Sequence, residues 1–456
     1  GLVTPTFLRK YWKYAVIVIL IVAAIVTPPD VVSQIIVTIP MLLIYEASIL
    51  ISSSAFLVQL HSMRLLPSFF TLNFFLLCLS SFLFFSSFNM IIPELPAYLT
   101  SLGGESYKGW IIALFTLSAG LSRPFSGKLA DKIGRIPVMI FGAAVCFVVG
   151  LSYPLLQFVG GFLFLRFAHG FSAGFTPTGT SAYVADTVPF AQRGEALGIQ
   201  SLFGSLGMAA GPALGGWIAS IWPIEVLFYS AAFTAIFSIL ILIRLKETLQ
   251  EKEPLRWKLF KLDKNEILEK RALLPSTILF LSVFSFGVVL TLVPDLSSHL
   301  GIQNKGLFFA VFTLSSLGIR LIAGRTSDRI GRVRVMRVAA AVMVLAMVAV
   351  AFASSKVMLL GAAVLFGAAV GMYSPTTTAW VVDRSLEQFR GRALATMYIF
   401  LELGIGLGAL VSGWLYGNES ANFQLAFLFS AGVASLGLVI LLFIKSDGKP
   451  EPLSVA

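Results

Sequence analysis

Uninterrupted apolar runs recur along nearly the whole of this sequence, and they limit its possible folds more than any other feature. Each run is about twenty residues long, the length that an α-helix needs to cross the hydrocarbon core of a bilayer. Only 12% of the 456 residues are charged, far below the share in a soluble globular chain. A membrane-spanning β-barrel would instead show short segments of alternating polarity. The sequence therefore predicts an all-α membrane protein.

The apolar runs divide the chain into parts. We expect two bundles of six transmembrane helices each, preceded by two extra transmembrane helices. The expected parts are an N-terminal fragment holding the two extra helices, a junction, the N-terminal bundle, a cytoplasmic linker, the C-terminal bundle and a cytoplasmic tail, at residues 1–55, 56–67, 68–245, 246–271, 272–447 and 448–456. The linker is the longest polar segment, as expected of a connection between two bundles.

An internal repeat relates the two expected bundles. The segment GKLADKIGR at residues 127–135 recurs as GRTSDRIGR at residues 324–332. Arg123 stands before the first copy, and Arg320 stands at the same distance before the second. Six helices followed by six related helices in the same orientation make a parallel membrane repeat. The sequence thus indicates a protein built from two similar halves.

The basic residues indicate how the helices are oriented. The net charge is +11, and most Lys and Arg residues, Arg123 among them, fall in loops or at helix ends on one side of the expected membrane. Lys108, Lys305 and Lys356 fall in loops on the other side, and Arg166 lies within a helix. Because cytoplasmic loops carry the excess of Lys and Arg, we expect both termini in the cytoplasm and no role in binding nucleic acid.

Motifs for enzymatic chemistry are missing from the sequence. Cys78 and Cys146 are the only cysteines, and both lie within apolar runs, which indicates neither a disulfide framework nor a metal cluster. The sequence also has no phosphate-binding glycine loop and no Ser–His arrangement outside the apolar runs. We therefore expect no cofactor, no metal and no enzymatic activity.

Three motifs resemble those of the major facilitator superfamily, and the resemblance covers about residues 63–447. The first is the loop segment at residues 127–135. The second is RFAHG at residues 166–170, in which His169 replaces the glutamine usual in the family. The third is GMAAGPALGG at residues 207–216, which is similar to the motif of proton-coupled antiporters. The resemblance implies a transporter whose two six-helix bundles rock about a central cavity.

The N-terminal fragment at residues 1–55 resembles a different family, the TatC subunit of twin-arginine protein translocation. The similarity rests on TP at residues 4–5, TPPD at residues 27–30 and YE at residues 45–46. Only the last two helices of that family and the preceding loop are represented. We interpret the fragment as a read-through or fusion from a neighbouring gene. The alternative, a component of the protein translocase, lacks most of that family's chain.

The resemblance implies that the loop motif acts as a conformational latch. Its residues are Gly127, Asp131, Lys132, Gly134 and Arg135, with Asp328 and Arg332 in the second copy. Such contacts are made in one state of a rocking transporter and broken in the other. A carboxylate in this turn can also interact with the positive end of a neighbouring helix. The alternative is that these residues merely anchor a loop at the lipid headgroups.

Arg166 is the most informative charge within an apolar run. An arginine at the centre of a transmembrane helix costs about 2.5–3.5 kcal/mol on insertion scales, so it should face the bundle interior and have a partner. The resemblance places it on the proton or substrate pathway. His169, one turn away, could titrate near neutral pH. The alternatives are an arginine bound to backbone carbonyls and a histidine that only forms hydrogen bonds.

Glu402 in the expected eleventh helix is the main candidate for a carboxylate that carries protons. Its neighbours in the sequence are apolar, and such a setting favours the neutral form of a carboxyl group. The alternative is a permanent ion pair with a basic group across the bundle. Glu94 and Asp295 compete for the role, but each follows a proline near the outer end of its helix. We expect those two to be gate or entrance residues.

The glycine-rich segment of the fifth helix allows two interpretations. Gly207, Gly211, Gly215 and Gly216 would let helices approach closely, and Pro212 would bend the helix and free a backbone carbonyl. Packing alone accounts for this composition. The resemblance adds a second role, in which the bend seals a proton leak in an antiporter.

Together these observations predict a secondary active transporter in the bacterial inner membrane. The favoured activity is proton-coupled efflux of a small organic molecule, and the alternative is uptake by proton symport. The expected partners are a small-molecule substrate, protons and the lipid bilayer. We expect a monomer, because two bundles are sufficient to enclose a cavity.

Overall fold

The computed structural model describes residues 69–189, 192–250, 252–254, 268–385 and 390–444. The chain divides into two compact units, Gly1–Phe75 and Leu76–Ala456, and the contacts discussed below belong to the second. The two helices expected at residues 1–55, the junction at residues 56–67 and the tail at residues 448–456 lie outside the described residues, as does much of the linker.

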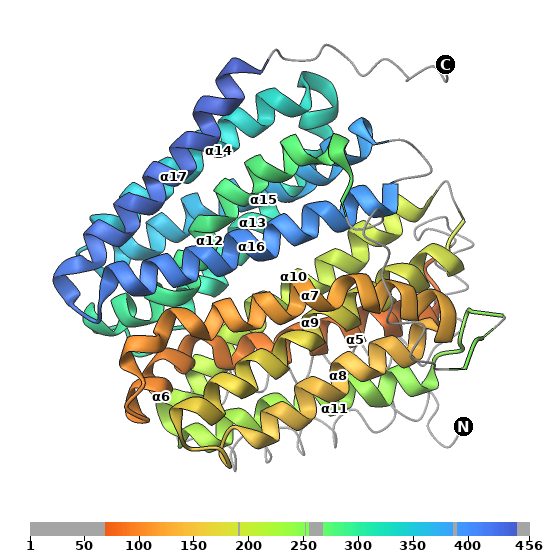
Figure 1. Ribbon diagram of the computed structural model, residues 1–456, viewed down its shortest axis with the longest axis horizontal. Coiled ribbons are helices and arrows are strands. Elements are labelled where there is room, and N and C mark those ends of the chain that lie inside the picture. Colours follow the sequence, from red (N-terminus) through yellow and green to blue (C-terminus); the bar gives the residue numbers. More distant parts are fainter. Residues whose placement is uncertain (1–68, 190–191, 251, 255–267, 386–389, 445–456) are drawn as a thin grey trace, which may run out of the picture. The chain divides into compact units, whose positions relative to one another are not determined.

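The described part of the chain is helical and contains no strand (Figure 1). In the N-terminal half the helices are α5 (Leu72–Ile91), α6 (Leu95–Ser101), α7 (Lys108–Ile133), α8 (Arg135–Ser152), α9 (Val159–Thr187), α10 (Arg193–Ile221) and α11 (Ile224–Arg244). In the C-terminal half they are α12 (Leu273–His299), α13 (Leu307–Ile330), α14 (Arg332–Ala351), α15 (Lys356–Arg384), α16 (Arg390–Tyr416) and α17 (Phe423–Phe443).

The two halves pack their helices in the same way, as the sequence repeat predicts. In the N-terminal half α9 packs on α7 and α8, and α8 packs on α11. In the C-terminal half α15 packs on α13 and α14, and α14 packs on α17. Two helix pairs join the halves, α7 with α16 and α10 with α13, and Figure 1 shows these helices running side by side. The repeat therefore generates two equivalent contacts between the halves.

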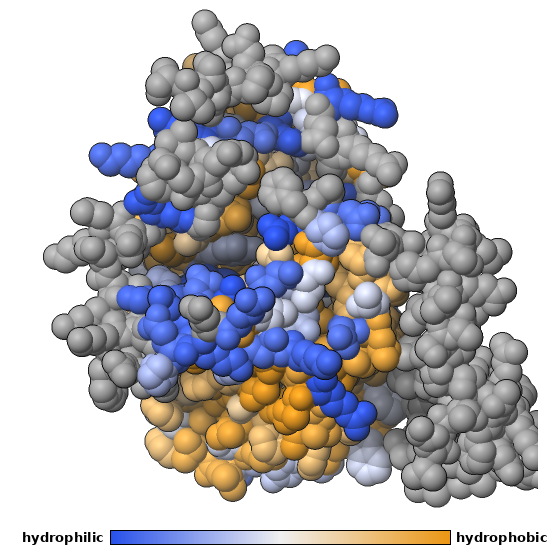
Figure 2. Space-filling model, turned by 90° about the vertical axis from the view of Figure 1, so that its right-hand side faces the viewer, coloured by the Kyte–Doolittle hydropathy of each residue, from blue (hydrophilic) through white to orange (hydrophobic). Residues whose placement is uncertain are grey.

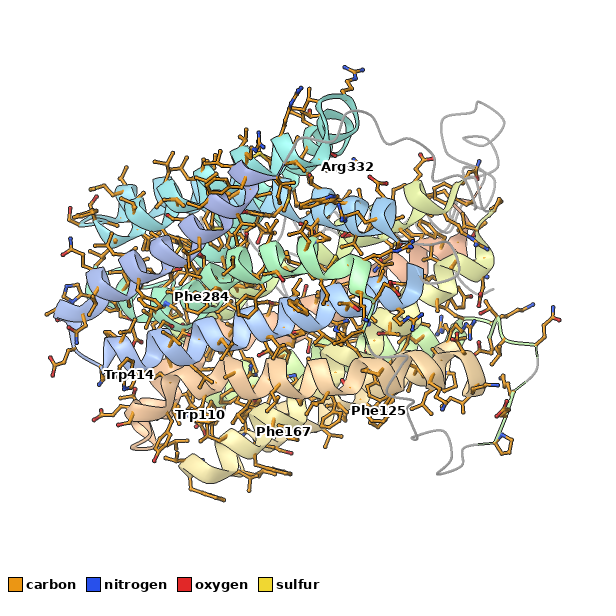
Figure 3. The ribbon with its side chains drawn as sticks, turned by 45° about the horizontal axis from the view of Figure 1, so that its top comes forward. Trp110, Phe125, Phe167, Phe284, Arg332 and Trp414 are labelled. Carbon is orange, nitrogen blue, oxygen red and sulfur yellow. The ribbon has the colours of Figure 1, made fainter. Side chains whose placement is uncertain are left out.

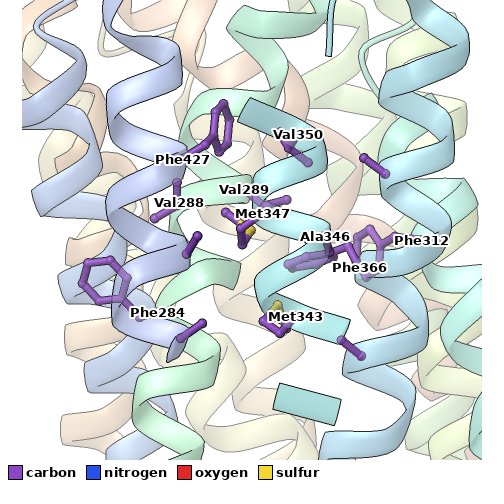
Figure 4. Packing of buried hydrophobic residues seen from close by; sticks show 14 of the residues in the cluster. Phe284, Val288, Val289, Phe312, Met343, Ala346, Met347, Val350, Phe366 and Phe427 are labelled. Atoms are coloured by element: carbon purple, nitrogen blue, oxygen red, sulfur yellow. The ribbon is translucent and has the colours of Figure 1, made fainter. Parts of the chain in front are cut away.

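Each half has a core of buried aromatic and aliphatic side chains, and the core of the N-terminal half also includes Ile405 and Ala409 of α16. Figure 4 shows the C-terminal core, in which Phe312, Met343 and Phe366 interdigitate between α13, α14 and α15. In the N-terminal half Tyr153 stacks on Phe228, with ring centroids 4.9 Å apart. Because lipid tails are as apolar as these side chains, close packing rather than exclusion of water holds such helices together.

The helices have two distinct ends. One end holds the turns at Gly134 and Gly331 and is here called the basic end. These turns require glycine because their φ angles of 126° and 98° are rarely adopted by other residues. Lys108 and Lys305 lie at the other end, here called the opposite end. Figure 3 places Trp110 and Trp414 at the opposite end, far from Arg332. Both tryptophans are exposed, as is typical of side chains at a membrane–water interface.

The lengths and hydropathies of the helices match those of a multi-pass membrane protein. Nine spans among the described residues are long and apolar enough to cross a bilayer. The other three long helices, α7, α9 and α13, carry charged or small polar residues, and each packs against at least two other helices. Neighbouring helices rather than lipid surround much of their surface. That all twelve long helices cross the membrane stays a prediction.

The surface of the basic end differs from the sides of the helices. Figure 2 views this end and shows hydrophilic residues gathered on it, with hydrophobic surface below them and a recess between the two halves. Along the sides, Phe233, Phe237 and Phe443 are all more than half exposed. Such large apolar residues on an outer surface indicate contact with lipid.

Candidate functional site

A buried ion pair joins the two halves midway along α7 and α16. The Nη2 atom of Arg123 lies 2.6 Å from Oε1 of Glu402. The side chains are only 15% and 8% exposed, and the guanidinium lies 4.5 Å from the ring centroid of Tyr398. The purely apolar setting expected for Glu402 is therefore wrong, and the contact matches the alternative of an ion pair with a basic group across the bundle. Our placement of Arg123 at a helix end is also wrong, since it lies well inside α7.

The related position between α10 and α13 has a different chemistry. Residues at equivalent positions in the two halves are separated by the same number of residues. Such pairs are Gly127 and Gly324, Arg123 and Arg320, Ser205 and Glu402, and Ser201 and Tyr398. Arg320 accordingly contacts Ser205 and Ser201, with Nη1–Oγ distances of 3.1 and 3.4 Å. The repeat thus builds the same contact twice, with a carboxylate in one copy and hydroxyls in the other.

Two further ion pairs join the halves at the opposite end. Lys108 lies 2.5 Å from Asp295, and Lys305 lies 2.6 Å from Glu94, measured from Nζ to the carboxylate oxygen. Each pair takes its lysine from one half and its carboxylate from the other. All four side chains are at most 16% exposed. The two pairs are therefore equivalent under the repeat.

Close backbone packing accompanies these outer ion pairs. A Cβ atom on Gly109 would lie 2.6 Å from the carbonyl oxygen of Ala409, and one on Gly306 would lie 1.8 Å from that of Pro212. Neither position leaves room for a side chain. Glycine and the two ion pairs together keep the halves in contact at the opposite end, whereas Figure 2 shows a recess between them at the basic end.

The residues of the expected latch lie at the basic end. Asp131 is 3.3 Å from Arg135 and its side chain is 70% exposed, and Arg135 also pairs with Asp186 at 2.9 Å. Arg332 repeats this geometry with Asp383 at 2.9 Å. Each of these pairs joins residues of one half.

The other residues of the motif contribute less to these contacts. Lys132 pairs with Glu253 in the linker at 2.7 Å, and both side chains are largely exposed. A Cβ atom on Gly127 would meet no atom within 4 Å among the described residues. The side chain of Asp328 is outside the described part of the structure. The latch therefore stays a prediction.

Arg166 lies in a fully buried polar cluster inside the N-terminal half. Its Nε atom donates to the carbonyl oxygen of Ile111 at 2.9 Å, and Nη1 donates to the hydroxyl of Tyr153 at 3.3 Å. The guanidinium also lies 4.8 Å from the ring centroid of Phe115. The Tyr153 hydroxyl is in turn 3.3 Å from Nδ1 of His169, whose Nε2 has no partner among the described residues. Among the residues that the structure describes, Arg166 thus contacts neutral groups, and the Ile111 contact matches the alternative of an arginine bound to a backbone carbonyl.

The glycines of α10 form a packing surface. A Cβ atom on Gly207, Gly211 or Gly215 would lie within 2.6 Å of a carbonyl oxygen of α5. One on Gly216 would instead meet Asn304, which precedes α13 in the other half. The segment therefore fixes the approach of α5 and of α13, and the antiporter role implied by the resemblance stays a prediction.

The basic partners of the carboxylates were missed from the sequence alone. Lys108 and Lys305 drew attention only as exceptions to the charge asymmetry, and Arg123 only as a repeated residue. Two signals could have identified them. Lys108 and Lys305 occupy equivalent positions in the repeat, and each half has a Pro-acidic-Leu segment, with Glu94 and Asp295 as the acidic residues.

Comparison with known proteins agrees with this architecture. Multidrug resistance protein MdtG of Klebsiella pneumoniae (strain 342) is 29% identical over 376 residues, which cover 78% of this chain and 89% of MdtG. The multi-drug resistance efflux pump PmrA of Streptococcus pneumoniae serotype 4 is 30% identical over 355 residues, which cover 74% of this chain and 88% of PmrA. A D-xylose-proton symporter of known structure shares the fold, with a TM-score of 0.66 at 18% identity over 83% of this chain and 98% of the symporter.

Two family models match different parts of the chain. The model of the Sec-independent protein translocase protein (TatC) matches residues 1–40, which lie outside the described residues. The model of the Major Facilitator Superfamily matches residues 77–303 and 275–455, and together these matches include both halves and the ion pairs between them. The chain therefore belongs to the Major Facilitator Superfamily.

Proposed function

We propose that this chain exports a small organic molecule in exchange for protons by alternating access. The two halves repeat one packing pattern, and the outer ion pairs close one end while the other end is recessed. Under the positive-inside rule the basic end is cytoplasmic, so the structure corresponds to a state open to the cytoplasm. On this proposal the protein lies in the bacterial inner membrane, as a monomer, with both termini in the cytoplasm.

The observation that carries the proposal is the Arg123–Glu402 ion pair. It is buried, lies midway across the expected membrane and joins the two halves. Removing one charge of a buried pair typically costs about 3–5 kcal/mol, because the other charge is left uncompensated. A proton that binds Glu402 would likewise leave the charge of Arg123 uncompensated. Protonation would therefore weaken a contact between the halves, which couples proton binding to rocking.

Export is favoured over uptake by two further observations. Two relatives that match most of this chain are a multidrug resistance protein and a multidrug efflux pump. The segment GMAAGPALGG in α10 is also similar to the antiporter motif, and its glycines lie directly at the contacts with α5 and α13. The TatC-like residues contribute nothing to this mechanism, and we assign them no translocase role.

The test uses inside-out vesicles with an imposed inside-acid pH gradient and a pH-sensitive dye. Cationic drugs, sugars and metabolites are added to wild type, to Glu402→Gln and to Glu419→Gln, whose carboxylate is exposed in a loop. We expect some compound to dissipate the gradient in wild type and Glu419→Gln but not in Glu402→Gln. Labelled solutes that instead enter right-side-out vesicles with protons would reveal an uptake symporter and contradict export.

A further inference from the structure

The arginines within α7, α9 and α13 differ in how their charges are compensated. Arg123 has a carboxylate, and Arg166 has a carbonyl oxygen, a hydroxyl and an aromatic ring. Arg320 has only the hydroxyls of Ser201 and Ser205 among the described residues. Charged side chains within a membrane usually pair with one another or with backbone carbonyls, so Arg320 is the exception.

The hydrogen-bonding capacity of Arg320 is only partly used. Its contacts with the serines both involve Nη1. The Nε atom is buried and has no hydrogen-bond partner in the described part of the chain. Nε and Nη2 lie on one edge of the planar guanidinium, in the geometry that binds both oxygens of a carboxylate. A buried donor without a partner carries a free-energy cost, which a ligand can remove.

The repeat shows which group is missing. The position equivalent to Ser205 is Glu402, whose carboxylate compensates Arg123. With serine at this position, Arg320 contacts a hydroxyl and lacks the negative charge that Arg123 has. Arg320 is partly exposed and Ser201 is exposed, so a ligand can reach the guanidinium while α10 and α13 stay packed against each other.

We propose that Arg320, Ser201 and Ser205 bind the carboxylate of the transported molecule. The ligand supplies to Arg320 the negative charge that Glu402 supplies to Arg123. The substrate class is thus an organic acid, whose carboxylate binds here. This assignment rests on the proposed transport function for its physiological meaning, but binding itself requires neither a gradient nor transport.

The test measures binding to the purified full chain in lipid nanodiscs, with 2-naphthoate and its neutral analogue 2-naphthamide as probes. Wild type should bind the carboxylate at least tenfold more tightly than the amide. Arg320→Gln should abolish this preference, and Arg320→Lys should retain part of it. Arg244→Gln, which removes an exposed arginine at the end of α11, should leave the preference unchanged and controls for loss of net charge.

A second pair of variants tests the site without removing Arg320. Ser205→Glu places a carboxylate at the position equivalent to Glu402 and should abolish the preference for 2-naphthoate. Ser205→Gln has nearly the same size without the charge and should retain it. Equal affinity of wild type for both probes, or an undiminished preference in Arg320→Gln or Ser205→Glu, would overturn the assignment. If vesicles show no proton exchange but wild type still prefers 2-naphthoate to 2-naphthamide, only the proposed antiport is refuted.

Discussion

Breaking one outer ion pair should shift the protein toward a state that is open at the opposite end. The perturbation is Lys305→Met, which keeps the length of the side chain and removes its charge. It leaves the Glu94 carboxylate, 9% exposed, without the cation that lies 2.6 Å away. Separation of the two halves would let water reach this carboxylate, so the closed state bears the cost of the substitution.

The size of the shift follows from burial. Breaking a buried pair typically costs about 3–5 kcal/mol. The Lys305 side chain is 16% exposed, so solvent screens the pair in part and the cost should fall below that range. A cost of about 2 kcal/mol corresponds to a roughly thirtyfold change in the ratio of closed to open molecules. Such a change is large enough to appear in a distance distribution.

The assay is electron–electron double resonance between spin labels on Ser106→Cys and Gln303→Cys. Both positions are exposed at the opposite end, one in each half. The native Cys78 and Cys146 are buried and should not take up label. We expect Lys305→Met to enlarge a population at longer distance, and the exchange Glu94→Lys with Lys305→Glu to restore the shorter one. An unchanged distribution in Lys305→Met would refute the reasoning.

Two further substitutions test the basic end and the glycine surface. Asp131→Asn should lower transport at least tenfold if the latch operates. Membrane insertion and Tm should stay normal, because the side chain is 70% exposed and contributes little to stability. Full transport in the vesicle assay would exclude the latch. Gly215→Ala should cost about 1–3 kcal/mol of stability from overpacking, since its Cβ would lie 1.9 Å from the carbonyl oxygen of Met90. Gly198→Ala, with no atom within 4 Å of its Cβ, should leave the Tm at least as high as that of wild type. Equal decreases in Tm in the two variants would contradict overpacking as the cause.

The sequence by itself determined the class of protein and its symmetry. Apolar runs of membrane-spanning length predict helices because every backbone group in lipid needs an internal partner. The recurrence of the loop motif predicted two similar halves, and the repeated packing of α9 and α15 agrees with it. Such features depend on composition and spacing along the chain, which a sequence displays directly. The matched family model likewise confirmed the resemblance that the motifs suggested.

Only the tertiary structure decided which charges compensate one another. The sequence showed that Arg166 and Glu402 needed partners, but it identified neither the neutral groups around the first nor Arg123 beside the second. It also did not reveal that Arg320 faces two serines. The physical reason is that a charge in an apolar run creates a requirement for some partner, whereas its identity depends on how distant helices cross and rotate. Packing between side chains sets those crossings, and hydropathy along one chain does not encode them.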